Sequence, residues 1–284
     1  MSKQITQGLV RRSAMATILI LTIVGLSVPC AAAEEPCIGT TVVTVPSRPT
    51  VANGTDITQC GVAELEYGLE RQWPGAGAHR SDISGGIRFG LTHNLDFHWF
   101  SGDFISASDS EGNRTGHGDD WFGLKYRLTE QTKRLPSFGV FYNVKAPTGN
   151  LALGSSGEVD HAFSFLTSKD VKYFHFDFNV IPQLAGRPDT SGFDHNVGFA
   201  LTTALRVSRR WTLITEPYGF TALNDSTREF TAMMGGVTFL AHPRLLLDGG
   251  LDVATSQYAP RKRVFAGITY AIANVYTWLH PEKN

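Results

Sequence analysis

The stretch YFHFDFNV, Tyr173 to Val180, decides the fold class because apolar and polar residues alternate strictly along it from position 174. The apolar positions are Phe174, Phe176, Phe178 and Val180. The polar positions between them are His175, Asp177 and Asn179. An α-helix would distribute these residues around its circumference, whereas a strand places alternate residues on opposite faces. The stretch therefore predicts a β-strand with one apolar face and one polar, charged face.

About twelve segments of this kind follow one another after position 59. Their approximate centres are Leu65, Ile87, Phe97, Leu124, Tyr142, Phe165, Phe176, Leu201, Leu213, Met234, Leu247 and Ile268. The expected short connections lie near 92–94, 132–134, 169–170, 208–210 and 242–244. The expected longer ones, rich in Gly, Ser or Asp, lie at 73–79, 106–118, 147–159, 185–191, 223–227 and 255–260. Short turns that alternate with long loops are typical of outer-membrane β-barrels.

A soluble periplasmic β protein is the alternative, because a β-sandwich also alternates along its strands. Here nearly every strand keeps large apolar residues on one face while charged residues sit in the middle of the other. In lipid every backbone polar group must be paired, and a closed sheet has no unpaired edges. We therefore predict an all-β fold, a transmembrane antiparallel up-and-down β-barrel of about 12 strands.

The two ends of the chain carry further signals. Lys3, Arg11 and Arg12 precede an apolar run, and small residues follow it, so residues 1–33 are predicted to be a signal peptide cut after Ala33. We expect an extended leader over 34–58 with a short strand at Thr41–Val45, a barrel over 59–272 and a C-terminal extension over 273–284. The sequence leaves open whether the leader fills the barrel or lies in the periplasm.

The composition indicates no nucleic-acid partner, and it leaves open whether two cysteines form a disulfide. The formal net charge is −1, so no basic surface for nucleic acid is indicated. In an oxidising compartment Cys37 and Cys60 can form a disulfide, and two unpaired thiols are the alternative. No cofactor and no metal site is predicted.

Several stretches resemble the outer-membrane family described as meta-pathway of phenol degradation proteins. They are DDWFGLKYRL at 119–128, FGVFYNVKAPTGN at 138–150 and GEVDHAFSFLTSKD at 157–170. The approach to the first strand, from Arg48 to Gly68, is similar as well. The resemblance covers about Arg48 to Ile272. It implies an outer-membrane channel, in some members associated with the breakdown of aromatic compounds.

Alternate residues of a strand face opposite sides of the sheet, and this parity places a set of charged residues inside the barrel. They are Glu64, Glu66, Arg88, Asp96, His98, Lys125, Arg127, Lys145, His175, Asp177, Arg206, Glu216, Asp248 and Asp252. One interpretation is a pore lining that selects solutes by charge and hydrogen bonding. The other is an internal salt-bridge network that fills a narrow barrel. Both can hold together, since a network can leave a narrow path.

The cluster at Lys145–Asn150 could be mistaken for a phosphate-binding loop. Such a loop needs its lysine after the glycines and a helix behind it, and neither condition is met. Pro147 instead ends a strand, because proline cannot donate a backbone hydrogen bond to the ladder. Lys145 is expected near one mouth of the barrel, where it meets either a solute or a neighbouring carboxylate.

We predict a passive channel for small, aromatic or hydrophobic solutes, exported by its signal peptide to a Gram-negative outer membrane. Its expected partners are membrane lipid and a small solute; the oligomeric state stays open. A barrel lipid hydrolase is one alternative, with Asp194-His195-Asn196 or His117, Asp119 and Asp120 as candidate residues. A structural or adhesive barrel with a closed lumen is another. We favour no catalysis, because acidic and histidine residues are ordinary in outer loops.

Overall fold

The computed structural model describes residue 37 and residues 41–75, 77–110, 112–188, 190–257 and 262–279. The predicted signal peptide lies outside these residues. The strands are β1 Val62–Gly75, β2 Ala78–Gly90, β3 Leu95–Asp109, β4 Gly112–His117, β5 Asp120–Thr129, β6 Ser137–Ala146, β7 Asp160–Val171, β8 Phe174–Gly186, β9 Phe193–Arg206, β10 Trp211–Phe220, β11 Phe230–His242, β12 Leu245–Ala254 and β13 Lys262–Asn274. A 3₁₀ turn, η1, spans Leu151–Leu153, and a short helix, α2, spans Val275–Leu279.

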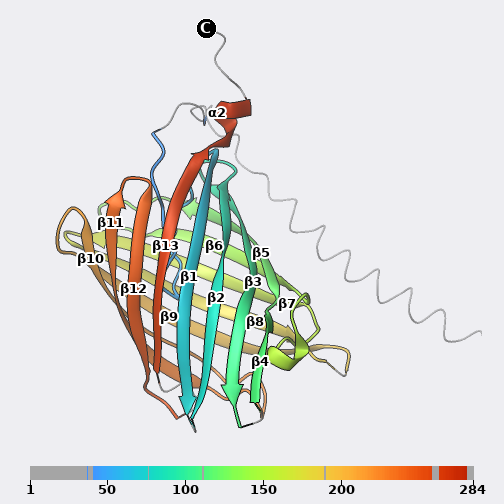
Figure 1. Cartoon of the computed structure of the whole chain (residues 1–284). Helices are drawn as coiled ribbons and strands as arrows, with labels where there is room; N and C mark the ends of the chain where they lie inside the picture. Colours follow the sequence, from blue (N-terminus) through green and yellow to red (C-terminus); the bar gives the residue numbers. More distant parts are fainter. Residues whose placement is uncertain are drawn as a thin grey trace, which may run out of the picture. The chain divides into compact units, whose positions relative to one another are not determined.

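Twelve of these strands close into an antiparallel barrel (Figure 1). Each strand pairs with its neighbour in sequence, and β1 closes the ring by pairing with β13 from Val62↔Asn274 to Trp73↔Lys262. The exception is β4, which pairs with the outer half of β3 and stands outside the ring, so that β3 also pairs with β5. The prediction of an up-and-down barrel of about twelve strands is confirmed.

The alternation seen in the sequence separates the two faces of the barrel wall. In β8, Phe174 and Phe178 are exposed on the outer face, whereas Asp177 and Asn179 are buried on the inner face. In β5, Leu124 is 46% exposed and its neighbour Lys125 only 2%. An outward apolar belt around a closed sheet is what lipid requires, because lipid offers no hydrogen bonds to polar groups. The barrel and this belt place the protein in the outer membrane.

Two segments predicted to be long outer loops are largely strand. Residues 73–79 contain the tight end of the β1–β2 hairpin, and residues 106–118 contain the end of β3 and all of β4. Their glycines were interpreted as loop residues, but Gly77 and Gly112 adopt positive φ angles of 78° and 121° at the hairpin ends. Glycine adopts that conformation without strain and so permits tight reversals. The remaining outer connections join β6 to β7, β8 to β9, β10 to β11 and β12 to β13.

The short turns gather at the opposite end, which therefore faces the periplasm. They join β2 to β3, β5 to β6, β7 to β8, β9 to β10 and β11 to β12. The last strand ends at Asn274, two residues beyond the predicted boundary, and continues directly into α2 at this same end (Figure 1). Within the described part of the chain, no helix has the length and apolar character needed to cross a membrane.

Candidate functional site: the barrel lumen and its internal segment

The segment that precedes β1 lies inside the barrel. We call residues 41–59 the plug. The strand expected at Thr41–Val45 is absent, because these residues pair with no neighbouring strand. Their backbone N–H groups find other acceptors: Val43 N donates to Gln59 Oε1 at 2.8 Å, and Thr44 N to the Pro243 carbonyl at 2.9 Å. The plug thus begins and ends at the periplasmic end of the barrel.

A segment without secondary structure cannot pair its own backbone N–H and C=O groups, so side chains of the lumen form hydrogen bonds with them. Glu216 of β10 gives the clearest case. Its two carboxylate oxygens accept hydrogen bonds from Val51 N at 2.8 Å and Ala52 N at 2.7 Å. Thr202 Oγ1 donates a further bond to the same carboxylate at 2.8 Å. Glu216 is completely buried, so these three donors take the place of water around its charge.

Side chains from the other side of the barrel bind the plug in the same way. The carboxylates of Glu64, Glu66 and Asp96 accept from Val45 N at 2.8 Å, Ser47 N at 2.7 Å and Thr58 N at 2.9 Å. Asn179 both accepts from Asn53 N and donates to its carbonyl, and Ser168 Oγ accepts from Thr55 N. The plug is therefore fixed along most of its length by strands from all around the ring.

Two buried cations of the barrel wall also form hydrogen bonds with the plug. Arg88 Nη1 donates to the Val45 carbonyl at 2.6 Å and pairs with Glu64 and Glu66 at 3.1 and 3.0 Å. Lys125 Nζ donates to the Asp56 carbonyl at 2.5 Å. Both side chains are at most 2% exposed, so neither charge has water as a partner. The internal network and the plug thus stabilise each other.

Arg48 is the plug residue whose side chain reaches the wall formed by β1, β13 and β12. Its Nε and Nη2 donate to the Asp248 carboxylate of β12 at 3.2 and 3.3 Å. The guanidinium lies over two glycines of neighbouring strands, Gly68 of β1 and Gly267 of β13. A Cβ added to either glycine would come within 2.6 Å of a guanidinium atom. The wall therefore lacks side chains at the place where Arg48 needs room.

Gly68→Ala is expected to displace Arg48 while leaving the barrel folded. The new Cβ would lie 2.3 Å from Arg48 Nη2, the end of a flexible side chain that can move away. We expect the pairing with Asp248 to be lost and single-channel conductance in planar bilayers to rise about twofold, because a pore conducts according to its narrowest section. The matched control is Gly235→Ala, where an added Cβ meets no atom within 4 Å. Equal conductance of the two variants would contradict this role of Arg48.

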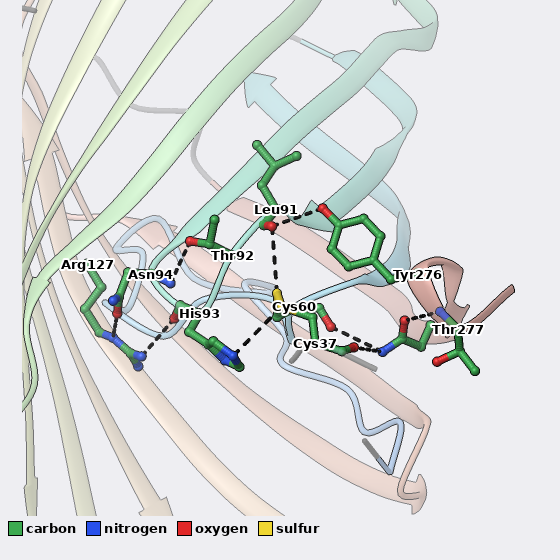
Figure 2. The surroundings of a disulfide bond; sticks show 10 residues. Cys37, Cys60, Leu91, Thr92, His93, Asn94, Arg127, Tyr276 and Thr277 are labelled. Carbon is green, nitrogen blue, oxygen red and sulfur yellow. Dashed lines mark hydrogen bonds between the residues drawn. A yellow bond between two sulfur atoms is a disulfide. The ribbon is translucent and has the colours of Figure 1, made fainter. Parts of the chain in front are cut away.

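A disulfide closes the plug into a loop at the periplasmic end (Figure 2). Cys37 and Cys60 are bonded, with their Cα atoms 5.2 Å apart, across 23 residues of sequence. His93, from the β2–β3 turn, approaches the Cys37 sulfur with Nε2 at 3.8 Å. Cys60 Sγ also contacts the Leu91 carbonyl at 3.7 Å, and Tyr276 Oη donates to that carbonyl at 3.0 Å. The group Cys37, Cys60 and His93 could in principle hold a metal, but the two sulfurs are engaged with each other.

Two large cavities of the lumen border on the plug, beside a small one of about 220 Å³ at Val51 and Arg263. The outer one, of about 370 Å³, has aromatic walls formed by Phe100, Trp121, Phe141 and Phe220. The periplasmic one, of about 430 Å³, is polar and charged, with Lys125, His175, Asp177 and Arg206 in its wall. Ser47, Arg48 and Thr50 line both cavities. These three plug residues therefore lie where the two cavities adjoin.

Lys145 is held at the outer mouth by carboxylates. Its Nζ lies 3.2 Å from Asp119 and 2.6 Å from Asp160, and it donates to Ser156 Oγ at 2.9 Å. Burial raises the pKa of the Asp119 carboxyl, but hydrogen bonds from Gly149 N and Ser155 Oγ and the nearby ammonium outweigh it and hold that pKa below its ordinary value. Lys145 therefore fastens the 147–159 loop to the barrel rim.

Comparison with known proteins adds the family. Residues 47–272 match the family described as "Putative MetA-pathway of phenol degradation". The chain belongs to this family. No curated protein with which the sequence was compared matches it.

Solved structures similar to this family member are outer-membrane barrels. The COG4313 outer membrane channel from Pseudomonas putida F1 is 14% identical, with a TM-score of 0.64, over 81% of this chain and 100% of that one. The KdgM porin is 7% identical and the NanC porin 10%, each with a TM-score of 0.51 over 74% of this chain; the matches cover 99% and 100% of those chains. At these identities the likeness concerns the fold.

The structure places the residues predicted to be inside the barrel on its inner face, where they do different things. The residues whose side chains contact the plug are Glu64, Glu66, Arg88, Asp96, Lys125, Glu216 and Asp248. His98 Nε2 donates to the Asp96 carboxylate at 2.9 Å, and Asp177 accepts from Ser168 and contacts His175. Arg127 lies at the periplasmic rim beside Glu130, and Arg206 lines the periplasmic cavity. Their place in a solute path stays a prediction.

Sequence reasoning missed part of the lumen. Parity alone could have found Glu70 and Arg263, which meet at 2.9 Å on the inner face, and Arg263 also pairs with Asp252. Parity could also have found the aromatic wall, since Phe141 alternates with the outward Val140 and Tyr142. No alternation of apolar and polar residues could have placed Arg48 in the lumen, because the plug is not a strand.

Proposed function

We propose that this outer-membrane barrel is a channel for small solutes with an aromatic or hydrophobic body. The observation that carries the proposal is the aromatic outer cavity, which shares the plug residues Ser47, Arg48 and Thr50 with a second, polar cavity in the periplasmic half of the lumen. Lumen faces of outer-membrane barrels are usually polar. Aromatic rings there favour an apolar solute, because burial of apolar surface stabilises binding.

The polar groups of the same cavity suit a solute that also carries a hydroxyl group or another small polar group. Asn143 and Gln183 lie in its wall, and Arg48 and Asn53 lie in its floor. A few placed polar groups within an apolar pocket orient a ligand. Arg48 is already paired with Asp248, so a full negative charge on the solute is not required for neutrality. Small phenol-like molecules fit this description.

The test is uptake of radiolabelled toluene and phenol by Gram-negative cells that make the protein. Whole cells are used because apolar molecules cross protein-free vesicles unaided. We expect uptake several-fold above cells with an empty vector. Ser164→Trp would fill the outer cavity and reduce uptake toward background, since Ser164 is buried in its wall. Phe163→Trp, at the adjacent lipid-facing position, is the control and should behave as the wild type.

A folded wild-type protein that passes neither solute and conducts no ions would contradict the channel. It would instead favour a structural barrel with a closed lumen. The observation behind that second candidate is the extent of the plug's bonding, which reaches β1, β3, β8, β10 and β12. Folding of every variant is checked by its heat-modifiable migration on a gel.

We also infer that the protein transfers solute without catalysis. The carboxylates near the candidate histidines have structural partners. Asp194 accepts from Arg187 Nε at 2.6 Å and from Asn224 Nδ2 at 3.0 Å, and Asp120 accepts from Gly102 N at 2.7 Å. In a catalytic triad the carboxylate is hydrogen-bonded to its histidine, and within the described residues no such bond joins these carboxylates to His195 or His117. Phospholipid turnover by the purified protein that is lost in His195→Ala would contradict this inference.

A further inference from the structure

Exposed cations without an ion-pair partner gather at one end of the barrel. They are Lys133, Arg134, Lys172, Arg209 and Arg210, and we call them the periplasmic cationic arc. All of them are exposed, and within the described part of the chain none of their side chains has an ion pair or a hydrogen bond. They occupy the β5–β6, β7–β8 and β9–β10 turns, which are consecutive along the rim because those strands are neighbours in the barrel.

The cations at the outer end are arranged differently. Arg80 pairs with Asp82, Arg187 with Asp194, and Arg263 with Glu70 and Asp252. Arg71 and Lys262 lie over the ring of Trp73 at 5.6 and 4.7 Å. Three further cations at the periplasmic end are also occupied. Lys169 Nζ donates to the carbonyls of Thr132 and Leu135, Arg127 pairs with Glu130, and Arg244 Nε donates to the Ala271 carbonyl at 2.9 Å. Absence of a partner, together with a place in a turn, therefore distinguishes the arc from the other rim cations, since Arg206 is the last residue of β9 and lines the periplasmic cavity.

Apolar side chains lie between the cations of the arc. Leu135 is 62% exposed, Tyr173 72% and Val207 52%, and each is within two residues of an arc cation in sequence. Trp211 follows Arg210 directly and points outward, with its ring 4.5 Å from that of Phe239. Aromatic and aliphatic residues at the ends of a membrane barrel sit at the boundary between acyl chains and headgroups. The cations beside them therefore lie at the level of the phosphates.

We propose that the periplasmic cationic arc binds the phosphates of anionic glycerophospholipids in the periplasmic leaflet. The positive charge of the arc and its position at the membrane boundary together identify this ligand. Arginine presents several N–H donors to a phosphate, and lysine adds a compact positive charge. The arc follows the rim at headgroup level rather than forming a compact patch on the end face, as a soluble partner would need. Each cation near an anionic lipid surface favours binding by about fivefold.

The experiment measures which lipid the purified full-length protein retains. Protein in detergent is mixed with equal amounts of phosphatidylcholine and phosphatidylglycerol, recovered on a column, and its bound lipid is extracted and quantified by mass spectrometry. At 50 mM NaCl we expect the retained phosphatidylglycerol to exceed phosphatidylcholine about tenfold. At 500 mM NaCl the preference should fall severalfold, because salt screens exposed charges.

The test variant changes all five arc residues to Gln, which keeps polarity and removes charge. We expect its lipid preference to fall to within twofold of unity. The control is Arg71→Gln with Lys262→Gln at the outer rim, which should keep the wild-type preference. Equal retention of both lipids by the wild type, or an unchanged preference in the arc variant, overturns the proposal. So does a wild type without lipid preference that binds soluble polyglutamate through the arc, since that result would indicate an acidic soluble partner.

Discussion

A chain whose mature part begins at Ile57, with Cys60→Ser to avoid a free thiol, is expected to conduct ions about tenfold better than the full chain, because removal of the plug joins its two lumen cavities into one. The barrel should still form, since its strands pair without help from the plug. Water then enters the lumen and hydrates groups such as Glu216 that the plug now covers. Single-channel conductance in planar bilayers measures the change.

The control for this experiment is the full chain with Cys37→Ser and Cys60→Ser. It lacks the disulfide but keeps the plug and its contacts with the lumen carboxylates. Its conductance should remain close to that of the wild type, because the bonds to Glu64, Glu66 and Glu216 do not depend on the disulfide. A truncated chain that folds and conducts no better than the wild type would show that the plug does not limit the path.

Arg88→Met is expected to lower the free energy of unfolding by about 3–5 kcal/mol, the cost of leaving buried charges without their partner. Arg88 is 1% exposed and faces the carboxylates of Glu64, Glu66 and Asp96 within 3.5 Å. Methionine fills a similar space and removes the charge. Urea unfolding in detergent micelles, followed by the loss of heat-modifiable migration, measures the change.

Arg127→Met is the matched control, because Arg127 lies in β5, two strands from β2 in the ring, at the periplasmic rim. Its partner Glu130 has a side chain that is 77% exposed, so this pair contributes less than about 1 kcal/mol. Adding Glu66→Gln to Arg88→Met should recover part of the lost stability, since it removes one of the buried carboxylate charges that Arg88→Met leaves unpaired. A cost for Arg88→Met as small as that for Arg127→Met would contradict the central place of Arg88 in the network.

The barrel itself could be predicted because lipid imposes one simple pattern on every strand. Leu247 and Leu251 face lipid and Asp248 and Asp252 face inward, as their alternation in sequence indicates. Strand ends were less predictable. Residues 106–118 were expected to be a loop, because in β4 no run of apolar residues distinguishes a strand that projects beyond the membrane.

The plug could not be predicted, because its partners are remote and its own sequence has no periodicity. Asn53 meets Asn179 across 126 residues, and Arg48 meets Asp248 across 200. The sequence did indicate the lumen side chains that bind the plug, because these are the inward-facing charged residues of the strands. Parity placed Glu216 and Lys125 inside, but it could not say that a backbone, rather than water, a solute or another side chain, would be their partner.

The position of the plug also has a consequence for how the barrel is assembled. The plug precedes β1, and the ring closes where β1 meets β13, the last strand of the chain. Glu66 of β1 binds Ser47, and Asp248 of β12 binds Arg48, so adjacent plug residues span the strands on both sides of β13. Because Cys37 and Cys60 tie both ends of the loop at one mouth, the loop can enter the barrel through that mouth after the final strand has docked. The segment that narrows the finished pore thus also fastens β1 to β12 across the strand that closes the ring.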